Sequence, residues 1–191
     1  MNIDALIAVV NTLHPIEDEV LRYLQEHITA VTCKSGHMLA TTGEFCTNVY
    51  FVNKGAIRGF IKDGTKDITT WISTENAFVT SISALDRSIP SFENIQAIED
   101  CELLSLSSSA LERLYVELPV FNITGRKLLQ EYYRDAEMRA YTVRLSNAET
   151  KYRFFLDHYS HLANRIQLRY IASYLGITLE TLSRVRRKLA G

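Results

Sequence analysis

The stretch IASYLGITLETLSRVRRKL, residues 171–189, arranges apolar and basic positions around a single glycine. Apolar residues recur at helical spacing on both sides of Gly176. Ala172 is small enough to lie where two helices cross, and Gly176 can adopt the left-handed conformation that ends a helix. Thr178 is a suitable N-cap for a second helix. These positions together predict a helix-turn-helix.

The two predicted helices run from about Gln167 to Tyr174 and from Leu179 to about Leu189. Their shared core would contain the apolar side chains Ile171, Leu175, Ile177, Leu182 and Val185. The polar positions would face outward, where arginine can bond guanine, glutamate can accept from a cytosine amino group, and smaller groups can bond phosphates. The candidate DNA-contacting residues are Arg169, Thr178, Glu180, Thr181, Ser183, Arg184, Arg187 and Lys188.

Charge is distributed unevenly along the chain. From Arg165 to Gly191 there are six basic residues and one acid, a net charge of +5. The other residues carry 15 basic and 21 acidic side chains, a net charge of −6. A basic end on an acidic body is typical of a nucleic-acid-binding domain. A solvated, charged helix face is the alternative explanation.

From about Ile28 to Leu106 the pattern changes to short strands separated by turns. The clearest piece is VYFVNKGAIRGFIKDGTKDITTWIS, residues 49–73, with Gly55 and Gly64 at its tight turns. Further strands are predicted at 37–41, 94–99 and 101–107. Several short strands at this spacing indicate an antiparallel β-roll or jelly roll. With the flanking helices, the fold class is α+β.

Helical patterns flank the strands. Residues 1 to about 27 have apolar residues at helical spacing on both sides of Pro15, and a serine-capped helix should end before Pro119. A long helix should follow over 119–146. A heptad-like seam along it, spaced 4-3-4-3, comprises Leu129, Tyr133, Ala136, Ala140 and Val143. We expect this seam to pack on a second subunit, and the alternative is that it packs on its own β-domain.

The length and composition of the chain exclude several classes of protein. The chain has 191 residues, 47% hydrophobic and 23% charged, as in globular proteins and unlike disordered ones. No apolar run approaches the roughly 18 residues of a membrane span, and the N-terminus lacks the basic region of a secretory signal. We therefore expect a cytoplasmic protein with no membrane partner.

Catalytic and metal-binding patterns are absent from the sequence. The three cysteines make no CxxC, so neither a disulfide framework nor a zinc site is indicated. The five histidines make no HxH pair, and P-loop, GxSxG and HExxH motifs do not occur. We expect no catalytic residue, no metal and no required cofactor, and hence no enzyme.

The chain resembles the CRP/FNR superfamily of bacterial transcription regulators over almost its whole length. The resemblance rests on Gly36, Gly43 and Gly55 in KSGHML, TTGEF and VYFVNKGAIRGF, on the DGTKDIT hairpin, and on GITLETLSRVRRKL. It implies a cyclic-nucleotide-binding-like sensor and a dimerising long helix. It also implies a homodimer that binds a near-palindromic operator in double-stranded DNA, with RNA polymerase as a further partner. Glu180 and Arg184 would then read bases.

The sensor departs from the family pattern where cyclic nucleotides bind. Family members that bind them carry Gly-Glu, and later Arg-Ser/Thr-Ala, for the ribose and the cyclic phosphate. Here Thr80-Ser81 and Ser91-Phe92-Glu93 stand at those places, and Arg87 is out of register. A phosphate would lose its charge-assisted partner, so we expect no cAMP binding in the usual way. The effector is unknown, and the candidate pocket residues are Phe78, Thr80, Ser81, Arg87, Ser91 and Phe92.

The expected pocket is collapsed, filled by side chains such as Phe78 and Phe92, with binding of another ligand as the alternative. Most family members follow the second helix with a β-hairpin wing, whereas this sequence ends at Gly191, so a wing-less domain is expected. The predicted domains are a sensor over 1–118, the dimerisation helix over 119–146 and the DNA-binding domain over 147–191. The alternative function is a dimeric ligand sensor or scaffold that no longer binds DNA.

Overall fold

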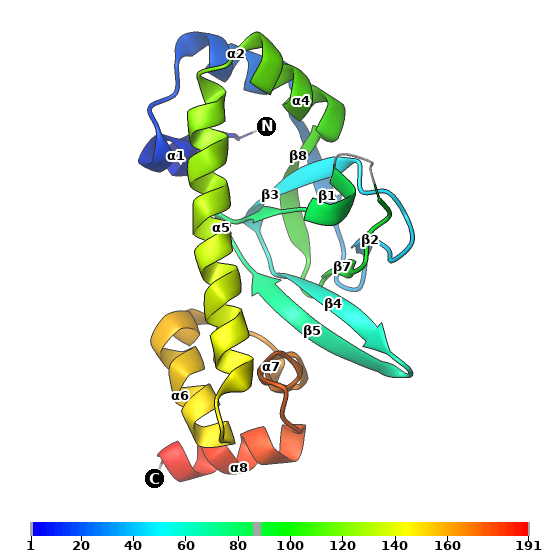
Figure 1. Cartoon of the computed structure of the whole chain (residues 1–191), viewed down its shortest axis with the longest axis vertical. Helices are drawn as coiled ribbons and strands as arrows, with labels where there is room; N and C mark the ends of the chain where they lie inside the picture. Colours follow the sequence, from blue (N-terminus) through cyan, green and yellow to red (C-terminus); the bar gives the residue numbers. More distant parts are fainter. Residues whose placement is uncertain (1, 86–88, 191) are drawn as a thin grey trace. The chain divides into compact units, whose positions relative to one another are not determined.

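The computed structural model describes residues 2–85 and 89–190 (Figure 1). Its contacts divide the chain into two compact units. The first unit comprises the described residues of Met1–Gly59 and Ile72–Glu131, and the second those of Phe60–Trp71 and Tyr132–Gly191. The elements are α1 (Asp4–Leu13), α2 (Asp18–His27), β1 (Thr29–Cys33), β2 (Met38–Ala40), β3 (Asn48–Lys54), β4 (Ile57–Asp63), β5 (Lys66–Ser73), β6 (Phe78–Val79), α3 (Ile82–Leu85), β7 (Asn94–Ala97), β8 (Cys101–Ser107), α4 (Ser108–Glu117), α5 (Phe121–Arg144), α6 (Ala148–Tyr159), the 3-10 turn η1 (Ser160–Leu162), α7 (Leu168–Leu175) and α8 (Leu179–Ala190).

The N-terminal helical pattern forms two helices, because Pro15 cannot continue the first one. Helix α1 ends at Leu13 and α2 begins at Asp18, whose acidic side chain suits the positive end of the helix dipole. The apolar stripes of both helices are buried. Val10 and Val20 are each 2% exposed and join a core cluster with residues of β3, β8 and α4.

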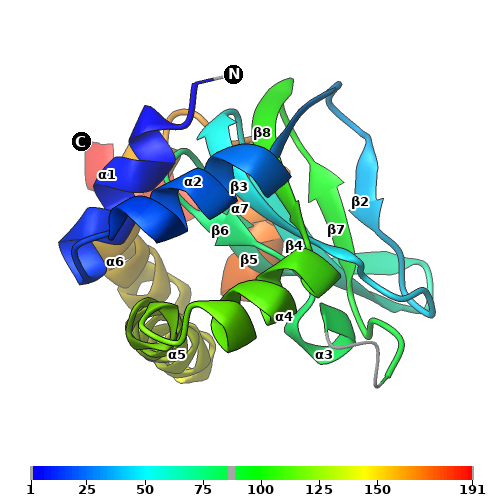
Figure 2. The ribbon, with the colours of Figure 1, turned by 90° about the horizontal axis from the view of Figure 1, so that it is seen from above.

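The strands form two four-stranded sheets, in the orders β1-β8-β3-β6 and β2-β7-β4-β5. Strand β8 pairs antiparallel with both β1 and β3. Leu103 and Leu104 lie next to each other on β8, on opposite faces, and both are buried. Leu104 belongs to the cluster beneath α1, α2 and α4, and Figure 2 shows these helices beside the sheet that contains β3 and β8. The predicted α+β class with an antiparallel β-roll is confirmed.

Most predicted strands occur with slightly different ends, and β5 spans 66–73 as expected. Strands β1 and β6 were not predicted individually. Strand β6 has two residues, too few for a period-two pattern. Strand β1 is an edge strand in which three of five residues are exposed, so its sequence, TAVTC, lacks a strong apolar signal.

A helix cap and a close helix contact shape the chain between β8 and α5. Ser107 caps α4 by accepting a hydrogen bond from the Ala110 amide at 3.1 Å, as the predicted serine cap requires. Gly125 on α5 lies against Tyr115 of α4, where a Cβ at position 125 would come within 2.6 Å of the Tyr115 hydroxyl. Any larger residue at this position would displace the Tyr115 side chain.

The second unit contains the end of α5 and the helices α6, α7 and α8 (Figure 1). Asn147 caps α6 by accepting a hydrogen bond from the Thr150 amide at 2.8 Å, which agrees with the predicted cap at Ser146 or Asn147. Tyr152 and Phe155 of α6 are 4% and 1% exposed and form its buried face. Asp135 of α5 accepts a hydrogen bond from Tyr159 of α6, so polar as well as apolar contacts join these helices.

Candidate nucleic-acid interface

The turn between α7 and α8 depends on the backbone of one residue. Gly176 has φ 62° and ψ 39°, the left-handed conformation, and its amide donates to the Ala172 and Ser173 carbonyl groups. The Ile177 amide also donates to the Ala172 carbonyl oxygen, at 3.0 Å. These bonds satisfy the last carbonyl groups of α7, in the manner of a Schellman motif. The predicted C-cap is confirmed.

The start of α8 is capped as predicted. The Thr178 hydroxyl accepts a hydrogen bond from the Thr181 amide at 3.2 Å, an arrangement that stabilises a helix by about 1 kcal/mol. The same hydroxyl and the Glu180 backbone amide lower the pKa of the Glu180 carboxyl, with the amide as the larger cause. Glu180 is therefore held as an ionised acceptor at the positive end of the α8 dipole.

The core between the helices is well packed. Ile171, Leu175 and Leu182 are each 0% exposed. Val185 is also buried, whereas Ile177 is only half-buried. Burying a side chain of this size contributes about 1.5–3 kcal/mol, so these residues hold α8 in a defined orientation on α7.

The exposed face of α8 is polar and mainly basic. Glu180, Arg184 and Arg187 are all exposed and lie at i, i+4 and i+7, which places them on one face. Leu182 and Val185 lie on the opposite, buried face. Thr181 and Ser183 are half-buried and flank the exposed face on either side. The Arg184 guanidinium donates to the Thr181 hydroxyl at 3.4 Å, a long contact that does not hold it firmly.

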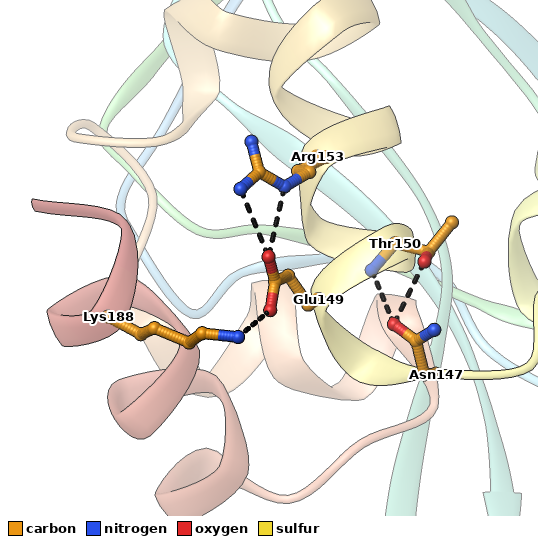
Figure 3. A network of polar contacts seen from close by, with 5 residues as sticks. All are labelled: Asn147, Glu149, Thr150, Arg153 and Lys188. Carbon is orange, nitrogen blue, oxygen red and sulfur yellow. Dashed lines mark hydrogen bonds and ion pairs between the residues drawn. The ribbon is translucent and has the colours of Figure 1, made fainter.

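Lys188 is engaged in an ion pair within the unit. Its Nζ lies 2.6 Å from Glu149 Oε2, and Glu149 Oε1 also accepts from Arg153 at 3.0 Å (Figure 3). Hydrogen bonds from Lys188 and Arg153 hold the pKa of the Glu149 carboxyl below its usual value. Lys188 thus links the C-terminal part of α8 to the first turn of α6 in addition to being a candidate phosphate contact.

Sequence reasoning missed three structural roles of basic residues. Arg186 is directed inward, where its Nη1 donates to the Ala163 carbonyl oxygen at 2.8 Å. Lys151 donates to the Leu175 carbonyl oxygen at 3.0 Å and so caps the end of α7. Arg169 stacks on the neighbouring Tyr170 ring, 4.7 Å from its centroid, and stays exposed. Helical spacing could have predicted the inward direction of Arg186, because this residue follows the buried Val185 on the core side of α8.

At the candidate effector pocket, the structure brings two of the predicted residues together. The Ser81 and Ser91 hydroxyl oxygens are 2.8 Å apart, and these residues are 0% and 2% exposed. Ser91 also donates to the Glu93 carbonyl oxygen at 2.7 Å. Thr80 donates instead to the Asn48 carbonyl oxygen at 3.0 Å. These hydroxyl groups are hydrogen-bonded within the protein, and none of them carries charge.

The two phenylalanines among the pocket candidates have different surroundings. Phe78 packs against Phe51, with ring centroids 5.1 Å apart, and belongs to the core beneath the helices. Phe92 is 70% exposed, so its ring does not fill a cavity. The expectation that the Phe92 ring fills the pocket is therefore wrong. Arg87 lies outside the described residues.

The predicted seam lies on α5, and its larger side chains are exposed in the single chain. Leu129, Tyr133 and Val143 are 57%, 68% and 47% exposed, and Ala136 and Ala140 are half-buried. Exposed apolar groups repeating at heptad spacing are typical of a helix that has a partner.

The described part of the chain has neither a candidate metal cluster nor a candidate membrane span. Within residues 2–85 and 89–190, no group of three or more His, Cys, Asp or Glu side chains is placed to hold a metal ion. Over the same residues, no helix has the length and apolar content that a bilayer crossing requires.

Comparison with known proteins agrees with this architecture. Residues 30–117 match the family described as the cyclic nucleotide-binding domain. A sequence comparison with the curated proteins finds no match.

Several solved structures share the fold at low sequence identity. The regulator CLP of Xanthomonas campestris superposes with a TM-score of 0.71 at 15% identity, covering 91% of this chain and 92% of that one. CooA of Carboxydothermus hydrogenoformans has a TM-score of 0.71 at 18% identity, covering 95% and 84%. A CRP/FNR-family protein of Eubacterium rectale also has a TM-score of 0.71, at 19% identity, covering 92% and 84%. Residues 30–117 thus match the cyclic nucleotide-binding domain family, and the chain has the fold of the CRP/FNR transcription regulators.

Proposed function

We propose that this protein is a cytoplasmic, non-catalytic transcription regulator that binds DNA as a homodimer. The observation that carries the proposal is the exposed face of α8. Glu180, Arg184 and Arg187 project from one side of a helix whose other side is buried on α7. A two-helix unit that presents the first turns of its second helix in this way suits the major groove.

Base readout is assigned to Glu180 and Arg184. An arginine can donate two parallel hydrogen bonds to guanine N7 and O6, and a carboxylate can accept from a cytosine amino group. The lowered pKa keeps Glu180 ionised and thus an acceptor. The long contact of Arg184 with Thr181 leaves the guanidinium donors available at little cost.

Phosphate contacts are assigned to the residues around this face: Arg169, Thr178, Thr181, Ser183, Arg187 and Lys188. Such contacts position a protein on the duplex without reading its sequence. Lys188 must share its charge between DNA and Glu149, 2.6 Å away, so its contribution is smaller than that of Arg187.

The seam on α5 supports a dimer. Pairing two α5 helices would cover Leu129, Tyr133 and Val143. A two-fold dimer would place two α8 helices in successive major grooves, about 34 Å apart, and would select a near-palindromic operator. RNA polymerase is the further partner that a regulator of this type would contact.

The uncharged hydroxyl groups of Ser81 and Ser91 support a sensor that does not bind cAMP in the usual way. The hydroxyl groups of Ser81 and Ser91 bond to each other, and a cyclic phosphate would meet no cationic partner from them. A thermal-shift panel that includes cAMP and c-di-GMP tests this, because a ligand that binds only the native state raises its melting temperature. A saturable shift with micromolar cAMP would refute this part of the proposal.

Selection of bound sequences from a random DNA pool tests the proposal as a whole. We expect a near-palindromic consensus bound with a steep salt dependence. Arg184→Ala should weaken consensus binding by about 1–3 kcal/mol and relax one base position. Arg113→Ala, which removes an exposed arginine from α4, is the matched control and should leave binding unchanged.

The alternative is a dimeric sensor or scaffold that does not bind DNA. One observation favours it: Arg186 and Lys188 are both engaged inside the unit, which reduces the basic charge that α8 offers. If the selection yields no enriched sequence even at low salt, while the chain remains a dimer, this alternative replaces the regulator.

A further inference from the structure

Two cysteines lie directly opposite each other in the first unit. Cys33 is the last residue of β1, Cys101 is the first residue of β8, and the antiparallel register pairs them. Opposed residues in antiparallel strands have Cα atoms about 4.5 or 5.5 Å apart, depending on the type of pair. Both values fall within the roughly 4.4–6.8 Å that a disulfide spans. The backbone therefore already has the separation that a disulfide requires.

The two side chains also share one face of the sheet. Residues alternate between faces along a strand, so the neighbouring pair on this face is Val31 and Leu103. Cys101 Sγ donates to the Glu99 and Ala56 carbonyl oxygens, at 3.3 and 3.6 Å, and each of the two thiols contributes to the pKa of the other. Opposed Cβ atoms lie about 4.5–5.5 Å apart, against a mean of about 3.8 Å in disulfides. To form a disulfide, the two Cβ atoms must therefore approach each other by about 1 Å.

Polar bonds hold the two strand ends in place. Asp100 precedes Cys101, and its carboxylate accepts from Lys34 Nζ at 2.7 Å and from the Ser35 amide at 3.0 Å. The residues that follow Cys33 are thus fastened to the residue before Cys101. This arrangement keeps the thiols opposite each other and favours closure within one chain.

The two thiols differ in their access to solvent. Cys101 is 3% exposed, and a Cβ built at Gly55 would come within 2.6 Å of its sulfur, so the β3–β4 turn covers it. Cys33 is half-buried on the edge strand β1. A reagent in solution therefore reaches Cys33 first, and Cys101 is placed to complete the bond from inside.

We propose that Cys33 and Cys101 form a redox-modification site that closes to an intrachain disulfide by exchange with a low-molecular-weight disulfide such as oxidised glutathione. The Cys33 thiolate attacks one sulfur of the reagent, forms a mixed disulfide and expels one glutathione thiolate, which takes up the proton that Cys33 lost. Cys101 then loses its proton, attacks the Cys33 sulfur and expels the second thiolate, which takes up that proton. Two protein thiols are oxidised, and one glutathione disulfide is reduced to two thiols.

The surroundings of the pair make this exchange slow in both directions. Burial is the main cause that raises the pKa of Cys33, and the Asp100 charge adds to it. Burial, with Cys33 and Glu99 nearby, raises the pKa of Cys101 to about 12. Little thiolate exists at neutral pH, so formation should accelerate about tenfold per pH unit. High-pKa thiols are also poor leaving groups, so the disulfide should resist reduction.

Incubation of the full chain with oxidised glutathione at pH 7, 8 and 9 tests the proposal. The reaction is stopped with acid and unreacted thiols are alkylated for mass spectrometry. We expect the number of alkylated cysteines to fall from three to one, a mass loss of about 2 Da before alkylation, and a linked peptide that joins Cys33 to Cys101. Three alkylated cysteines after prolonged treatment at pH 9 would overturn the proposal. So would a bond that involves Cys46, or one that joins two chains on a non-reducing gel.

Single variants separate the order of the two steps. Cys46→Ser removes the third thiol and should leave the linked peptide unchanged. Cys101→Ser should stop at a glutathione adduct on Cys33, a gain of about 305 Da. Cys33→Ser should slow modification of Cys101 at least about tenfold, because the remaining thiol is covered. Equal reactivity of the two single variants would overturn the assigned order, and a melting curve of each variant verifies that it is folded.

Discussion

Lys188 of α8 and Glu149 of α6 form an ion pair, with Lys188 Nζ 2.6 Å from Glu149 Oε2 (Figure 3). The pair lies at the flank of the face that carries Glu180 and Arg184. One carboxylate therefore neutralises part of the basic charge proposed to contact DNA, and it also joins the two helices.

Neutralising Glu149 should strengthen binding to DNA. In Glu149→Gln, Lys188 no longer has an anionic partner and can neutralise a phosphate, so the slope of log K against log salt should steepen by about 0.9. Fluorescence anisotropy over a series of salt concentrations measures this. Asp157→Asn makes the same change of charge on α6, at another exposed position, and should have a smaller effect. Equal effects of the two variants would mean that only net charge matters.

The Glu149 ion pair should also make a small contribution to stability that depends on pH. The pKa of Glu149 lies below its usual value because Lys188 and Arg153 hydrogen-bond to its carboxylate. A lowered pKa stabilises the fold fully above the unfolded-state value of about 4.3 and loses that contribution as the pH falls through the folded-state pKa. The difference between the urea midpoints of wild type and Glu149→Gln should therefore be largest at pH 6 and should shrink as the pH falls below the unfolded-state pKa. Parallel curves would contradict this account.

Gly176→Ala should destabilise the second unit. The residue has φ 62°, and the nearest atom to an added Cβ is Lys151 Nζ at 3.8 Å, so the cost comes from the backbone and not from a clash. We expect a loss of about 1–2 kcal/mol in the free energy of unfolding, measured by urea denaturation. Gly176→Asn is the matched control and should cost less, because asparagine tolerates this conformation better. An equal loss of unfolding free energy in both variants would mean that side-chain packing, and not the backbone conformation, causes the destabilisation.

Tyr133→Glu should dissociate the proposed dimer. Tyr133 is 68% exposed in the single chain and lies on the seam. Two carboxylates buried at a dimer interface should weaken association at least about 100-fold, which sedimentation or gel filtration at several concentrations detects. Tyr141→Glu changes another exposed tyrosine, eight residues further along α5 and off the seam, and should leave the dimer intact. Dimers that persist in Tyr133→Glu would place the interface elsewhere.

Some features follow from local sequence alone, because their causes lie within a few residues. The caps at Ser107 and Thr178, the helix end at Gly176 and the interruption at Pro15 each depend on one side chain or one backbone conformation. The same holds for the strand β5, which follows directly on the turn at Gly64. The DNA-contacting roles of α8 remain a prediction, although the structure exposes the face on which they depend.

Other features required the tertiary structure, because they join residues far apart in the chain. The bond between Ser81 and Ser91, the position of Phe78 beneath the helices and the inward direction of Arg186 depend on neighbours that no local pattern specifies. The cysteines show this most clearly. Their spacing in the sequence indicated no site, yet the register of β1 on β8 brings Cys33 and Cys101 opposite each other across 68 positions. Local sequence determined where helices and strands begin and end, and long-range pairing decided which of their side chains meet.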